Sequence, residues 1–124
     1  MGCSEEFFRA YVGAALWSSN DDDGEPLDDG RDESDVAPEA LASMRKDCDA
    51  FCDAHAELLA QVPAKHQWSS DELNGHDFWL TRNGHGVGFW DRGYGALGER
   101  LSEACRAYGG CDLYVGDDGK IHVS

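Results

Sequence analysis

The sequence predicts a single α+β domain in which two antiparallel β-hairpins form one sheet packed with three α-helices. Its length of 124 residues is that of one compact domain, residues 1–124, with no room for a second core. Apolar residues recur every three or four positions across residues 38–62, which indicates a helix. Asn83-Gly84 and Gly116–Gly119 are turn sequences of the kind that join adjacent strands.

Three segments have the apolar spacing of amphipathic helices. The first runs from Ser4, a favourable N-cap residue, to Trp17. The second begins at Pro38, whose ring suits a first helical turn, and is ended by Pro63. The third spans residues 94–108. The second helix has the longest core-facing stripe, made of Leu41, Met44, Cys48, Phe51, His55, Leu58 and Val62.

Residues 75–93, with the sequence GHDFWLTRNGHGVGFWDRG, predict the first hairpin. With Asn83-Gly84 as a two-residue turn, Phe78 faces Phe89 and His76 faces Asp91 across the strands. Trp79 and Trp90 then lie on the opposite face of the hairpin, and they would form an exposed aromatic patch if no helix covers them. A Ser-Ser-Asp-Glu capping signal just before this hairpin predicts a short turn or helix at residues 69–73.

The second hairpin is predicted at the end of the chain. A three-residue loop with Gly119 in the left-handed conformation pairs Leu113 with Val123 and Val115 with Ile121. Two hairpins with apolar faces need a common partner, because an isolated hairpin is only marginally stable. They are therefore expected to share one sheet.

Twenty-five acidic residues against ten basic ones give a formal net charge of −15. Eleven of these acids lie within residues 1–36, and residues 18–36 are expected to form a flexible acidic loop with too little apolar surface to order itself. Proteins that bind nucleic acids or anionic membranes directly use Lys and Arg, so both functions are disfavoured. Basic protein surfaces and metal cations remain as binding partners.

The five cysteines follow no spacing that indicates a disulfide framework, and neither a signal peptide nor a membrane-spanning segment is expected. We therefore expect a cytoplasmic protein in a reducing compartment. Cys48, Cys52 and His55 share one helix face and could bind zinc, with His66 or Cys105 as a fourth ligand. These positions also make the apolar stripe, so core packing is the favoured interpretation.

A hydrolase would require general acid and base groups or a bound metal. The candidates are His76, Asp77, His85 and Asp91, since the hairpin register makes His76 and Asp91 cross-strand neighbours. The four side chains do not converge in that register, because Asp77 points to the other face. The sequence therefore assigns no catalytic residue, no metal site and no cofactor.

The motif HDFWLTRNGHG of residues 76–86, followed by GFWDRG at residues 88–93, resembles a family of small acidic proteins encoded by tailed phages and prophages. The similarity extends to residues 17–19 with the acidic loop, to residues 37–39 and to residues 112–119. The resemblance implies a phage accessory protein, a group in which many members inhibit host defence. It implies no activity or catalytic residue.

The expected function is that of a phage-encoded acidic binding protein in the host cytoplasm. It would occupy the basic groove of a nucleic-acid-binding defence factor, as an anti-CRISPR or anti-restriction inhibitor, by presenting carboxylates in place of phosphates. The alternatives are a small metal-dependent hydrolase and a phage structural or assembly protein. The predicted partner-binding residues are Asp21, Asp22, Asp23, Asp28, Asp29, Asp32, Asp35, Asp47, Asp49, Asp53, Trp79 and Trp90.

Overall fold

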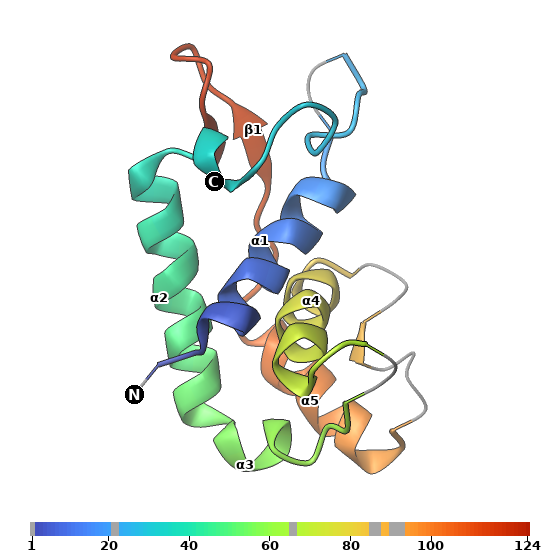
Figure 1. The fold of residues 1–124 in the computed structure, drawn as a ribbon. Helices are drawn as coiled ribbons and strands as arrows, with labels where there is room; N and C mark the ends of the chain where they lie inside the picture. The colour runs from blue at the N-terminus through green and yellow to red at the C-terminus, as the bar shows by residue number, and fades with distance from the viewer. Residues whose placement is uncertain (1, 21–22, 65–66, 85–87, 90–93) are drawn as a thin grey trace.

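Five α-helices, one short 3-10 helix and one two-stranded antiparallel sheet are present in residues 2–20, 23–64, 67–84, 88–89 and 94–124, which the computed structural model describes (Figure 1). The chain is thus a mixture of helix and strand, as predicted, with more helix than expected. The elements in order are α1 (Glu5–Ser18), η1 (Glu33–Asp35), α2 (Pro38–Ala54), α3 (Ala56–Leu59), α4 (Ser70–Arg82), α5 (Ala96–Arg106), β1 (Leu113–Val115) and β2 (Ile121–Val123).

The first two helices begin where their capping residues predict. The Ser4 hydroxyl accepts a hydrogen bond from the Phe7 backbone N–H at 3.1 Å, which satisfies one of the free donors of the first turn. Pro38 opens α2. The predicted continuation of α2 to Val62 is wrong, because the helix ends at Ala54 and His55 leaves the helical conformation with φ −124° and ψ 25° before α3 begins.

The hairpin predicted over residues 75–93 is also wrong, because residues 70–82 form α4. Its N-terminus has the predicted capping box, in which the Ser69 hydroxyl accepts from Glu72 N–H while the Glu72 carboxylate accepts from Ser69 N–H, each at 3.1 Å. Gly84, expected in a hairpin turn, follows the helix with φ +73°. The predicted second strand falls in part on residues 85–87 and 90–93, which lie outside the described residues.

The alternation of apolar and polar residues misled the prediction because α4 is buried on every side near its C-terminal end. All six residues from Asp77 to Arg82 are buried, so neither the apolar nor the polar residues of this alternating pattern mark a solvent-exposed face. A helix buried all round has no amphipathic stripe. The expected sheet of two hairpins is therefore replaced by a central helix.

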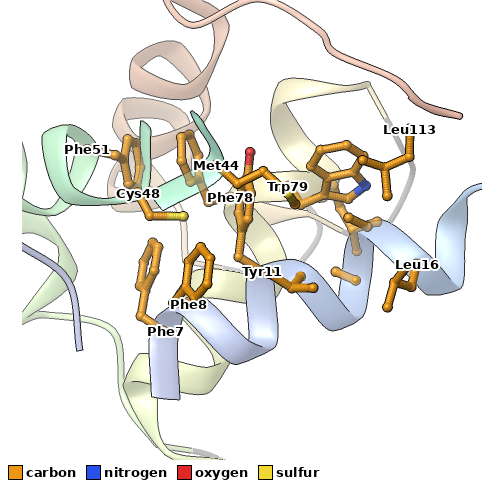
Figure 2. Packing of buried hydrophobic residues seen from close by; sticks show 14 of the residues in the cluster. Phe7, Phe8, Tyr11, Leu16, Met44, Cys48, Phe51, Phe78, Trp79 and Leu113 are labelled. Carbon is orange, nitrogen blue, oxygen red and sulfur yellow. The ribbon is translucent and has the colours of Figure 1, made fainter. Parts of the chain in front are cut away.

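The first and fourth helices pack closely and run in the same direction. Ser69 at the start of α4 donates to the Glu6 carboxylate, and the Trp79 indole N–H near its end donates to the Ser18 hydroxyl at 2.8 Å. Gly75 makes this approach possible, since a Cβ at that position would lie 2.0 Å from the Phe7 carbonyl oxygen. Aromatic rings fill the core around the contact (Figure 2), and the Phe51 and Phe78 rings stack with centroids 4.0 Å apart.

A buried guanidinium joins α4 to three other parts of the chain. The Arg82 side chain, 4% exposed, pairs with the Asp47 carboxylate of α2 at 2.8 Å and donates to the Tyr11 hydroxyl of α1 at 3.0 Å. It also donates to the backbone carbonyls of Tyr108 and Gly109 at 3.1 and 2.9 Å. Its charge is therefore compensated by a carboxylate, a hydroxyl and two carbonyls.

The C-terminal hairpin is confirmed with the predicted register. Leu113 pairs with Val123, Tyr114 with His122 and Val115 with Ile121, and Gly119 has φ +79°. Val36, at the end of the acidic segment, forms a parallel bridge with Ile121, and Ala37 N–H donates to the Ile121 carbonyl at 2.8 Å. The acidic segment and the hairpin therefore lie at the same end of the molecule (Figure 1).

Candidate binding surface

The described part of the acidic segment is attached to the core at two positions that the sequence reasoning missed. Leu27 is completely buried, and its backbone N–H donates to the Ser19 carbonyl at 2.9 Å beside a bridge between Asn20 and Pro26. Val36 is 3% exposed. The segment was expected to have too little apolar surface to order itself, but these two residues do bury apolar surface.

Most acids of this segment face solvent. Asp32 and Asp35 form a capping box around η1, in which each carboxylate accepts a backbone N–H at 2.9 Å. Hydrogen bonds from the side chain and the backbone N–H of Ser34 lower the pKa of the Asp32 carboxyl. Asp21 and Asp22 lie outside the described residues. The exposed acids are Asp23, Glu25, Asp28, Asp29, Asp32 and Glu33, while Asp35 is half-buried.

The three predicted acids of α2 all have contacts within the chain. Asp47 pairs with Arg82. Asp49 and Asp53 accept hydrogen bonds from the backbone N–H groups of Cys3 and Gly2 at 2.9 and 2.8 Å, which fixes the start of the chain against α2. The bond from Cys3 lowers the pKa of the Asp49 carboxyl. These acids support the fold, and their use in partner binding remains a prediction.

Trp79 does not lie on an exposed aromatic face. It is in α4, is 1% exposed, and its ring meets Tyr11 edge-on with centroids 5.4 Å apart (Figure 2). The prediction that it contacts a partner is wrong, because the face assigned to it belongs to a hairpin that the structure replaces with a helix. Trp90 lies outside the described residues.

Of the hydrolase candidates, the structure brings His76 and Asp77 together. The His76 Nδ1 atom is 3.2 Å from Oδ1 of Asp77, whose side chain is completely buried. The predicted geometry differs, since it placed Asp77 on the opposite face from His76. His85 and Asp91 lie outside the described residues.

Cys48 and Cys105 are buried, whereas Cys3, Cys52 and Cys111 are partly buried. Each of the five is free, and burial raises the pKa of the Cys48 and Cys52 thiols, so neither favours the thiolate that binds zinc. The His55 ring packs on Phe51 with centroids 5.2 Å apart. Within the described residues, no group of three or more His, Cys, Asp or Glu side chains is placed to hold a metal ion.

An aromatic groove that the sequence did not predict lies between α1 and the start of α4. It has a volume of about 680 Å³, and its walls include Trp17, Trp68 and His76. Trp17 is 55% exposed and Trp68 is 43% exposed. The His76 ring lies between them, with centroids 6.1 Å from Trp17 and 6.5 Å from Trp68. We call these residues, with Glu6, Arg9, Gly13 and Glu72, the tryptophan groove.

No described helix combines the length and the apolar character needed to cross a membrane. No family model matches the chain, and no curated protein or solved structure matches it either.

Proposed function

We propose that this protein is an acidic binding protein that occupies a basic surface of a host nucleic-acid-binding factor, as an anti-CRISPR or anti-restriction inhibitor does. The observation that carries the proposal is the row of exposed carboxylates between Asp23 and Glu33, on a segment whose apolar anchors Leu27 and Val36 are buried. Carboxylates held on an attached segment lose less conformational entropy on binding than those of a free tail. The resemblance of the sequence to phage accessory proteins supports the same proposal.

The charge of the chain adds to this argument. A net charge of −15 produces a field that attracts cationic surfaces over about 8 Å at physiological salt. The same field repels nucleic acid. Because the protein and a nucleic acid would bind the same basic groove and repel each other there, they should compete for it. Binding should therefore weaken steeply as salt increases.

The test uses the immobilised full chain, host lysate, and washes of low and high salt. The expected partner is retained at low salt, released at high salt and displaced by added duplex DNA or RNA. Replacing Asp28 and Asp29 with Asn should reduce capture at least tenfold. The matched control replaces Glu99 and Glu103, two exposed acids of α5, with Gln, and it should retain capture since α5 lies at the other end of the molecule (Figure 1).

Capture that does not depend on salt would contradict the electrostatic mechanism. Equal losses in the loop variant and in the α5 variant would show that total charge, and not the acidic segment, controls binding. Capture that is insensitive to added nucleic acid would exclude the groove of a nucleic-acid-binding factor as the target.

A second candidate is a small hydrolase, and the observation that favours it is the contact between His76 and the buried Asp77 carboxylate. A carboxylate that orients an imidazole is the arrangement of a general base. Elemental analysis of the purified protein provides the test, because stoichiometric zinc or manganese would favour the hydrolase over the binding protein.

A further inference from the structure

We propose that the tryptophan groove binds an arginine side chain presented by the basic partner. This inference rests on the proposed function, since it names the group by which that partner is held. A volume of about 680 Å³ falls within the range of ligand pockets, which is about 300–1,000 Å³. The groove is thus large enough for a side chain and the backbone that carries it.

The aromatic walls suit a planar cation. Trp17 and Trp68 are each more than 40% exposed, so their ring faces are available to a ligand. A cation over an indole ring is attracted by the negative face of its π-system, and the guanidinium group of arginine also stacks on it as a plane. Exposed tryptophans in a concave site are also the residues that most often dominate binding energy in protein interfaces.

Three side chains of the groove can accept hydrogen bonds: Glu6, Glu72 and His76. The Glu6 carboxylate is held by the Ser69 hydroxyl at 3.2 Å, and Glu72 is held in its capping box, so both carboxylates are positioned before binding. When the His76 ring is neutral, its bond to the Asp77 carboxylate places the proton on Nδ1 and leaves Nε2 as an acceptor. A guanidinium, with five N–H donors and no acceptor, complements this set.

Among the described residues that line the groove, Arg9 is the one with a permanent positive charge, and acids on the same helix oppose that charge. Glu6 lies one helical turn before it, and Arg9 also contributes to the lowered pKa of the Glu5 carboxyl, for which a hydrogen bond from Arg45 is the larger cause. Glu6 and Glu72 also line the groove, so carboxylates outnumber guanidinium groups among its described residues. An anionic ligand is therefore disfavoured and a cationic ligand is favoured.

The first experiment titrates the isotope-labelled full chain with the peptide acetyl-Gly-Arg-Gly-amide and follows the indole N–H resonances. Saturable shifts are expected at Trp17 and Trp68 and not at the buried Trp79. The same peptide with citrulline in place of arginine has nearly the same shape without the charge. It should bind at least tenfold more weakly.

The second experiment fills the groove. A Cβ added at Gly13 meets no atom within 4 Å, so Gly13→Leu places a side chain in the groove without disturbing the backbone of α1. Peptide affinity should fall at least tenfold. The control is Tyr114→Leu, which removes an aromatic ring that is 48% exposed on β1 and does not line the groove, and it should leave affinity unchanged.

Equal affinity for the citrulline peptide, unchanged affinity in Gly13→Leu, or stronger binding of inorganic phosphate or a mononucleotide would each overturn the inference. Lysate capture separates it from the proposed function. If Gly13→Leu loses the peptide but keeps partner capture that depends on Asp28 and Asp29, the inference fails while the proposed function stands. If the peptide binds in the groove but neither salt nor those acids affect capture, the proposed function fails while the chemistry of the groove stands.

Discussion

Replacing Gly75 with Ala tests the contact on which the helical core depends. The new methyl group would lie 2.0 Å from the Phe7 carbonyl oxygen and 2.8 Å from its carbonyl carbon, whereas ordinary contacts of a Cβ are 3.4–4 Å. Because the opposing atoms belong to the backbone of α1, no side chain can rotate away to relieve the clash. The helices must separate by about 1.4 Å, the difference between 3.4 and 2.0 Å.

The loss of stability depends on the side chains that pack between α1 and α4 beside Gly75. Separation by 1 Å or less already removes a quarter to a half of the dispersion energy of a contact, at about 0.1–0.2 kcal/mol per atom pair. Tyr11 and Phe78, both completely buried with ring centroids 5.2 Å apart, would lose much of theirs. Overpacking costs about 1–3 kcal/mol or more, and the gain in helix propensity from Gly to Ala returns at most about 1 kcal/mol. We expect Gly75→Ala to lower the free energy of unfolding by about 3 kcal/mol.

The assay is chemical denaturation followed by circular dichroism, with Gly13→Ala as the matched control. Gly13 is also inside a helix, but its added Cβ meets open space, so this variant should gain about 0.5–1 kcal/mol. The two identical substitutions are thus expected to have opposite signs. A Gly75→Ala protein as stable as the unsubstituted chain would refute the close approach of α4 to α1.

Arg82→Met should lower the free energy of unfolding by about 3 kcal/mol in the same assay, because Asp47 and two carbonyls lose their donor, whereas Asp47→Asn should cost only about 1 kcal/mol since its amide oxygen still accepts. Burial raises the pKa of the Cys48 and Cys105 thiols, so the unfolded chain alone loses these protons above about pH 8.5. The contribution of these thiols to the free energy of unfolding should be constant below that pH. Above it, the free energy of unfolding should fall by about 1.4 kcal/mol per pH unit for each thiol, as denaturation at pH 7 to 10 can measure. The hydrogen bond from the Cys3 backbone lowers the pKa of the Asp49 carboxyl, so the ionised carboxylate stabilises the fold at neutral pH. This stabilisation is lost as the pH falls through the lowered pKa, and a carboxyl-carbon NMR titration of Asp49 measures that pKa.

Local signals in the sequence predicted the elements that depend on neighbours in the chain. The Ser4 cap, the Pro38 start and the turn before Gly119 each act over a few residues, and the structure confirms all three. The helix at residues 70–82 depends on burial by distant segments, which hides its period. The capping box at Ser69 and Glu72 was a better guide than the Asn-Gly turn signal that follows it.

The candidate site was predictable only in its charge. Composition indicates an acidic surface, but it cannot distinguish a solvent-exposed acid such as Asp28 from Asp47, whose partner Arg82 is 35 positions away. The exposure of Trp17 and Trp68 is equally a property of the packed molecule, because it depends on which face of α1 the fourth helix covers. A large aromatic residue normally indicates core, and these two are exceptions.

The contacts of Arg82 limit how this sequence can change. One guanidinium serves Tyr11, Asp47 and the carbonyls of Tyr108 and Gly109 through three of its nitrogen atoms, and a lysine has a single ammonium nitrogen that cannot occupy those positions together. A lineage that replaces this arginine must therefore alter three separate stretches of the chain at nearly the same time. Melting should likewise occur as one event, since the detachment of any of these stretches leaves N–H donors of a buried guanidinium without an acceptor.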